Sequence, residues 1–86
     1  MDINAAAEAI DGFLRTYTGA GGRRAAEVQV RPSGDDMNAI KVWVDLGPGV
    51  GDDDCAAWSG EAEGAIRDKL GDKLGDWTLE MRTESL

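Results

Sequence analysis

The clearest alternation of apolar and polar side chains lies in residues 39–46, Ala-Ile-Lys-Val-Trp-Val-Asp-Leu. Apolar side chains occupy the even positions, and Lys41, Trp43 and Asp45 stand between them. Successive side chains of a β-strand point to opposite faces, so this period of two predicts a half-buried strand. We expect it to be the middle strand of a small sheet.

Two shorter segments with the same alternation, residues 27–31 and 77–83, predict two further strands. Pro32 follows the first of them, and Ser33-Gly34-Asp35-Asp36 supplies turn residues before the middle strand. These two strands should therefore form an antiparallel hairpin with a loop of about six to seven residues. The side chains expected to point inward from the flanking strands are Val28, Val30, Trp77, Leu79 and Met81.

Apolar residues spaced by threes and fours predict a helix over residues 3–17, with Asp2 as its N-cap and Gly19 just past its end. A second apolar stripe predicts a helix over residues 53–70 or 53–74. The sequence Lys-Leu-Gly-Asp occurs twice in tandem there, so Gly71 or Gly75 can end this helix.

Gly60 and Gly64 interrupt the second helix, and the first helix carries Ala6 and Ala7. Small residues on two helices allow a close approach of their backbones, which is the role we assign to these glycines.

The element order is α-β-β-α-β, which predicts an α+β fold in one small domain over residues 1–86. A three-stranded, mainly antiparallel sheet would have both helices packed on one face. The favoured spatial strand order is three-one-two, in which every neighbouring pair is antiparallel. The order one-two-three, with one parallel pair, is the alternative.

The charge is strongly acidic and unevenly distributed: 9 Lys and Arg against 17 Asp and Glu give a net charge of −8. Residues 1–43 hold six acids and five bases, or −1, and residues 44–86 hold eleven acids and four bases, or −7. Such a surface repels nucleic acid and anionic membranes and attracts basic partners.

The chain contains one cysteine, Cys55, so it cannot form an intrachain disulfide. The first residues carry acid where a signal peptide carries base, and no apolar run approaches the ~20 residues that span a bilayer. These features favour a soluble, cytoplasmic protein.

Candidate catalytic chemistry is sparse. The sequence has no histidine, so Cys55 lacks an imidazole base, and neither a Ser-His-Asp triad nor a zinc site of Cys and His ligands can form. The glycine-rich segments 18–24 and 47–51 lack the spacing of phosphate-binding loops, and three aspartates would repel a pyrophosphate after the second. We expect no catalytic residues, no bound metal and no cofactor, and hence no enzyme.

The first candidate binding surface is acidic. One interpretation is helix capping together with ordinary solvation, because acids favour a helix N-terminus. The other is a docking surface for a basic partner. Its residues are Asp45, Asp52, Asp53, Asp54, Glu61 and Glu63.

The second candidate is the face of the sheet that points away from the helices, with Trp43 at its centre. An exposed tryptophan there would be an anchor for a partner or for a second subunit. The alternative is a tryptophan covered by arginine side chains. The residues assigned to this face are Arg31, Lys41, Trp43, Glu80 and Arg82.

A weaker basic group could contact nucleic acid, but it would have to overcome the field of the acidic half. Its members are Arg15, Arg23, Arg24 and Arg31.

The function we expect is that of a small acidic binding or inhibitor protein, which occludes a basic, nucleic-acid-binding surface of another macromolecule. Phage-encoded inhibitors of host defence, anti-CRISPR proteins among them, and immunity proteins against nuclease toxins are similar in size and charge. The expected partner is a basic protein or nucleoprotein complex, not a nucleic acid or a membrane, and the chain itself is a monomer or homodimer. The alternative is a homodimeric structural or assembly subunit that uses the face around Trp43, with the charge serving solubility or adaptation to high salt.

Overall fold

The computed structural model describes residues 2–34, 38–75 and 77–86. The chain forms α1 (Ile3–Thr16), β1 (Glu27–Pro32), β2 (Ala39–Asp45), α2 (Asp52–Leu70) and β3 (Thr78–Glu84). Two short 3₁₀ turns, η1 (Ala20–Gly22) and η2 (Gly71–Leu74), follow the two helices. The predicted α+β class and the order α-β-β-α-β are confirmed, and the turn predicted at Asp35 and Asp36 lies outside the described residues.

The strand order is β1-β2-β3, so the favoured order three-one-two is wrong and the alternative is confirmed. β1 pairs with β2 in antiparallel register, whereas β2 pairs with β3 in parallel register. A helix of 19 residues spans ~28 Å and a seven-residue strand only ~23 Å, so α2 returns the chain to the level where β2 begins. β3 therefore runs in the same direction as β2 in either strand order, and its position beside β2 makes the pair parallel. α1 packs against β1, and α2 packs against β3 on the other side of β2.

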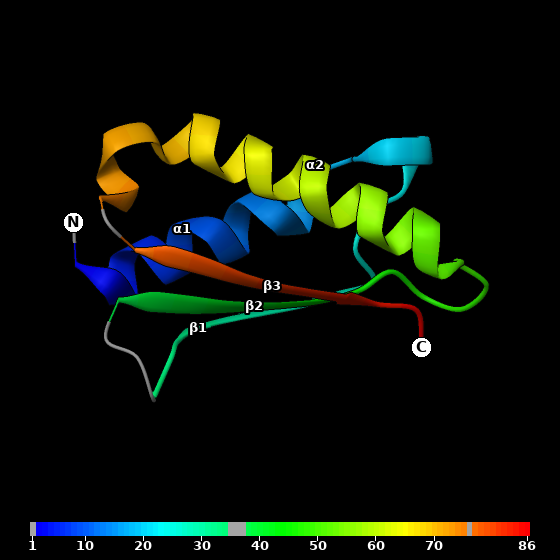
Figure 1. The fold of residues 1–86 in the computed structure, drawn as a ribbon, viewed down its shortest axis with the longest axis horizontal. Helices are drawn as coiled ribbons and strands as arrows, with labels where there is room; N and C mark the ends of the chain where they lie inside the picture. The colour runs from blue at the N-terminus through cyan, green and yellow to red at the C-terminus, as the bar shows by residue number, and fades with distance from the viewer. Residues whose placement is uncertain (1, 35–37, 76) are drawn as a thin grey trace.

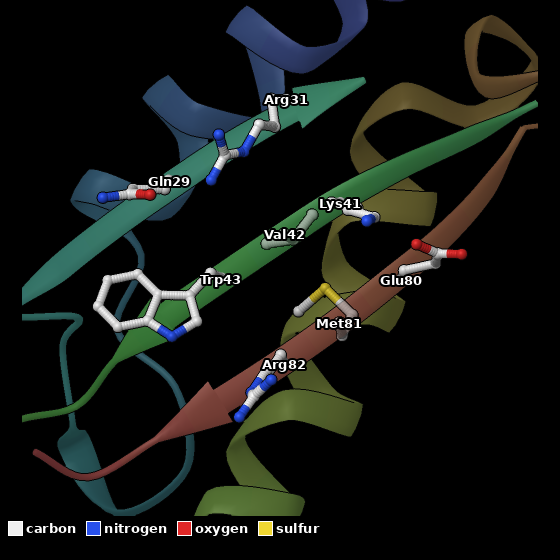
Figure 2. A pocket seen from close by; sticks show the side chains of 8 residues that line it. All are labelled: Gln29, Arg31, Lys41, Val42, Trp43, Glu80, Met81 and Arg82. Carbon is white, nitrogen blue, oxygen red and sulfur yellow. The ribbon is translucent and has the colours of Figure 1, made fainter. Parts of the chain in front are cut away.

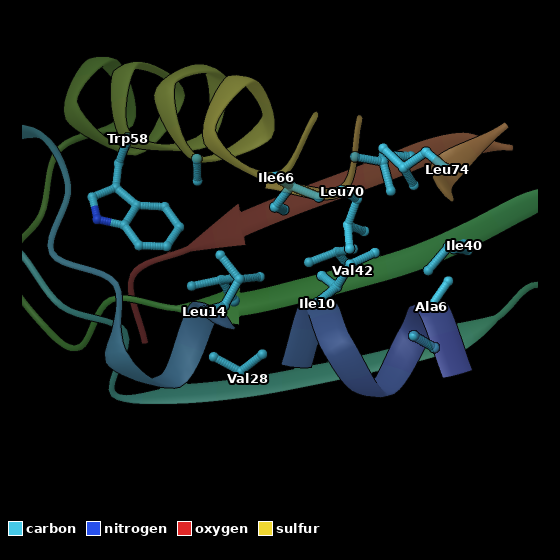
Figure 3. Close-up of a cluster of buried hydrophobic side chains, with 14 of the residues drawn as sticks. Ala6, Ile10, Leu14, Val28, Ile40, Val42, Trp58, Ile66, Leu70 and Leu74 are labelled. Carbon is cyan, nitrogen blue, oxygen red and sulfur yellow. The ribbon is translucent and has the colours of Figure 1, made fainter. Parts of the chain in front are cut away.

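Both helices lie on one face of the sheet, and none of the helices and strands described covers the other face (Figure 1). α1 packs against β1, α2 packs against β3, and their apolar stripes meet the inward side chains of the sheet (Figure 3). The predicted inward residues of β2 are buried. The largest fully buried side chains are Trp58, Ile10, Leu14, Ile40, Ile66, Val42 and Val44.

The ends of the helices follow their local chemistry. The Asp2 side chain accepts a hydrogen bond from the Ala5 amide at 2.8 Å, which confirms the predicted N-cap of α1. Gly19 does not terminate α1, because the cap residue is Tyr17 in an extended conformation. α2 ends at Gly71, whose φ of +52° suits glycine, and η2 ends in the same way at Gly75.

The glycines of α2 do not mark a helix contact, so that prediction is wrong. Gly60 and Gly64 are exposed, and a methyl group added to either would have no neighbour within 4 Å. The close approach occurs at Gly19 instead, where a Cβ would lie 2.7 Å from Nε1 of Trp58. That indole is fully buried, and its N–H donates to the Arg23 carbonyl at 2.9 Å. Trp58 thus holds the connection after α1 against α2.

We expect Gly19→Ala to lower the free energy of unfolding by ~1–3 kcal/mol, because the methyl group must displace the Trp58 ring or the backbone. The matched control, Gly64→Ala, lies in an exposed helix interior and should raise stability by ~0.5–1 kcal/mol. Urea unfolding followed by circular dichroism measures both. Equal effects of the two substitutions would contradict the packing described here.

Candidate functional site

Nine side chains on the uncovered side of the sheet form three cross-strand rows, and we call the surface made by these nine the open face. Its order follows from the strand register, since paired residues on neighbouring strands share a face. The acidic row contains Glu27, Asp45 and Glu84. The central row contains Gln29, Trp43 and Arg82. The mixed row contains Arg31, Lys41 and Glu80. The structure thus brings together all five residues that the sequence assigned to this face.

Trp43 occupies the middle of the open face (Figure 2), where it is half-buried. Its indole N–H donates to Oε2 of Glu84 at 2.7 Å. The other carboxylate oxygen of Glu84 accepts from Arg82, at 3.0 Å from Nε and 2.9 Å from the terminal guanidinium nitrogen. These hydrogen bonds hold the ring in one orientation.

Arg82 is 75% exposed and pairs with a carboxylate, so it does not cover the ring. In the described part of the chain no cation–π contact to Trp43 is formed. Trp43 therefore presents an oriented apolar surface between polar neighbours.

A shallow hollow of about 500 Å³ lies beside Trp43 on the open face (Figure 2). Side chains of the central and mixed rows form its rim, and Val42 and Met81 contribute to its floor. The hollow is open to solvent, so it suits a protruding side chain of another protein better than a small enclosed ligand.

The acidic row lies where β2 and β3 end and β1 begins. Asp45 has a local structural role, since its Oδ1 accepts from the amides of Gly47 at 2.8 Å and Leu86 at 3.1 Å. Three carboxylates directly across neighbouring strands repel one another. The row therefore concentrates negative charge at this edge.

The three aspartates that open α2 lie at the same end of the molecule (Figure 1). The connection to α2 is tied to the C-terminus, because the Val50 amide donates to Oγ of Ser85 at 3.0 Å. The Leu46 amide likewise donates to the Glu84 carbonyl at 2.9 Å. We call this region, which extends over both sides of the sheet, the acidic end. Its members are Glu27, Asp45, Asp52, Asp53, Asp54 and Glu84.

The aspartates at the start of α2 do not cap the helix with their side chains. The N-cap residue is Gly51, and no side chain donates or accepts a capping hydrogen bond there. Asp54 lies 3.6 Å from Arg23. Asp52 and Asp53 are exposed and have no ion pair with any described residue. These aspartates therefore stabilise α2 through their interaction with the helix dipole and not through capping hydrogen bonds.

Glu61 and Glu63 lie apart from the acidic end, farther along α2. Glu61 accepts a hydrogen bond from the Tyr17 hydroxyl at 3.1 Å, and Glu63 lies 3.8 Å from Arg67. Residues two positions apart on a helix point to different sides, so Glu61 and Glu63 do not share a surface. The structure brings four of the six predicted acids together and adds Glu27 and Glu84, which only the strand register could reveal.

The predicted basic group is dispersed among internal contacts. Arg15 pairs with Asp11 and donates to the Val28 carbonyl at 3.1 Å. Arg23 is near Asp54, Arg24 donates to the carbonyl of Arg15 at 3.4 Å, and Arg31 lies on the open face. These arginines form no continuous basic surface.

Within residues 2–34, 38–75 and 77–86, no group of three His, Cys, Asp or Glu side chains is placed to hold a metal ion. Cys55 is buried. None of the helices described has the length and apolar character needed to cross a membrane. Comparisons with protein-family models, with curated proteins and with solved structures found no match.

The pKa of Glu84 is lowered, first by the hydrogen bond from Trp43 and then by the hydrogen bond from Arg82. Because the pKa of this carboxyl is lowered, the hydrogen bond between Trp43 and Glu84 is fully formed at pH values above the ordinary pKa of glutamate. It is lost as the pH falls through the lowered pKa. We expect the indole N–H resonance of Trp43, assigned by its loss in Trp43→Phe, to shift with a midpoint below the ordinary pKa of a glutamate side chain.

In Glu84→Gln this titration should disappear, whereas in the control Glu80→Gln, which leaves the bond to Trp43 intact, it should persist. NMR spectra recorded between about pH 2.5 and 7 provide the measurement. A midpoint at or above the ordinary value would contradict the link.

Proposed function

We propose that this chain is a small acidic binding protein that occludes a basic surface of another macromolecule and has no catalytic role. The acidic end is the observation that supports the proposal most strongly. Six carboxylates gather there, and the ion pairs described in that region involve only Arg23 and Arg82. The surplus negative charge is therefore available to a partner.

The arrangement suits lysine and arginine side chains that normally hold phosphates. Neighbouring strands lie ~4.8 Å apart, so the acidic row sets its carboxylates at short, regular intervals. Arginine binds carboxylate and phosphate with the same paired hydrogen bonds, so carboxylates can take the place of phosphates. A concentrated negative field also accelerates association with a positive surface.

The proposed partner is a basic protein or nucleoprotein complex rather than nucleic acid itself, because the arginines are dispersed and the acidic end repels phosphates. The proposal places the chain in the functional class of phage anti-defence inhibitors, anti-CRISPR proteins included, and nuclease-immunity proteins. A cytoplasmic site of action is part of the proposal.

The test is to compare two charge-matched variants as immobilised bait for basic proteins of a cell extract. Asp52→Lys with Asp53→Lys removes two unpaired acids of the acidic end. Glu8→Lys with Asp68→Lys makes the same charge change at exposed positions elsewhere. We expect the wild type and the control to retain the same basic partner. The variant with Asp52→Lys and Asp53→Lys should bind this partner at least about tenfold more weakly, a loss of ~1.4 kcal/mol of binding free energy.

Raising the salt from about 0.05 M to 0.3 M should release this partner, because screening weakens contacts between exposed charges. Added duplex DNA should displace the acidic protein by competing for the basic surface. Binding that is equal in both variants, or that DNA leaves unchanged, would contradict the proposal.

A further inference from the structure

The charges on the open face follow a definite order along the strands. β1 runs from Glu27 through Gln29 to Arg31, and β2 reads Asp45, Trp43 and Lys41 in the same spatial direction. β3 adds Glu84, Arg82 and Glu80. The acidic row thus carries three negative charges, whereas the mixed row carries two positive charges and one negative charge. Trp43 lies between the two rows.

We propose that the open face binds a second copy of this chain, related by a two-fold axis that runs across the strands through Trp43. This rotation places the acidic row of each copy over the mixed row of the other. Glu27 then faces Arg31 of the second copy, and Asp45 faces Lys41 of the second copy. Because a two-fold interface is isologous, each of these opposite-charge contacts occurs twice.

The charge order selects this axis over the other face-to-face arrangement. A two-fold axis along the strands would set each acidic row over the acidic row of the second copy, which costs free energy. The crosswise axis leaves like charges at two places: Glu84 faces Glu80 of the second copy, a contact that occurs twice, and Arg82 faces Arg82 of the second copy. Glu84 already has Arg82 as an ion-pair partner at 2.9 Å, which reduces the repulsion.

The centre of the face provides the apolar contact that such an interface requires. Trp43 is oriented by its 2.7 Å hydrogen bond to Glu84, so little side-chain freedom remains to be lost on binding. The shallow hollow beside it, rimmed by Gln29, Lys41 and Arg82 among others, offers space for the indole of the second copy. A buried tryptophan at the centre of an interface is a typical energetic anchor.

Association through the edge of the sheet is less favourable at β1. The guanidinium of Arg15, paired with Asp11, donates to the Val28 carbonyl at 3.1 Å. β1 is an edge strand, and this carbonyl would otherwise be available to an added strand. The arginine therefore protects the β1 edge against an added strand.

The size of the face predicts a weak dimer. Three strands span ~14 Å and seven residues ~23 Å, a footprint well below the ~800 Å² that each partner buries in a standard interface. We expect a dissociation constant on the order of 10–100 μM at low salt. The dimer does not depend on the proposed function. Asp52 and Asp53 lie on α2, on the other side of the sheet, and stay exposed in the dimer, whereas the acidic row is covered and is open to a basic partner only in the monomer (Figure 1).

Sedimentation equilibrium of the intact chain tests the proposal, at about 5–500 μM and at about 0.05 M and 0.5 M salt. Wild type should pass from monomer to dimer as its concentration rises, with weaker association at high salt. Trp43→Ala should weaken the dimer at least tenfold, and Glu8→Arg, an exposed acid outside the face, should leave it unchanged.

A charge exchange tests the register independently of Trp43. Glu27→Arg alone and Arg31→Glu alone should each be monomeric, because each brings like charges together. An equimolar mixture of the two variants restores both contacts and should form a heterodimer, and the double variant should again form a homodimer. A wild type that stays monomeric at all concentrations, or a mixture that fails to associate, would overturn the proposal.

Discussion

The whole structure depends on the burial of one side of β2. Ile40, Val42 and Val44 are at most 1% exposed, and both helices contribute side chains to cover them. Each such side chain contributes ~1.5–3 kcal/mol when fully buried, a large amount for so small a domain. Two helices suffice for one face of three strands, and the described residues form no third α-helix for the other face. The open face is thus a direct consequence of how the core is covered.

The alternating and helical periods predicted every helix and strand to within a residue or two. They also assigned the inward side of each strand. Burial of one face makes apolar side chains such as Val42 alternate with outward side chains such as Trp43, and this alternation is visible in the sequence. They could not decide the strand order. Because α2 carries the chain back along the full length of β2, β3 has the direction of β2 in both orders and can pair antiparallel with β1 or parallel with β2. In the structure α1 packs against β1 and α2 against β3, so each helix covers one edge strand and β3 lies beside β2.

The binding surfaces were predictable in part for a similar reason. The members of the face around Trp43 follow from alternation along single strands. The acidic row does not, because Glu27, Asp45 and Glu84 are neighbours only through the register. In the sequence they belong to three separate segments, and Glu84 lies one residue beyond the third strand predicted over residues 77–83. Conversely, Glu61 and Glu63 are close in sequence, yet one pairs with Tyr17 and the other with Arg67.

Both proposed interactions use surfaces that the order β1-β2-β3 creates, so this order is the central claim. Nuclear Overhauser effects between backbone protons of neighbouring strands test it most directly. We predict contacts in the parallel pattern between Trp43 and Arg82 and between Lys41 and Glu80, together with antiparallel contacts between Gln29 and Trp43. Contacts between β1 and β3 instead would show the order three-one-two. They would separate the β3 member of every row from its β2 neighbour and contradict the account.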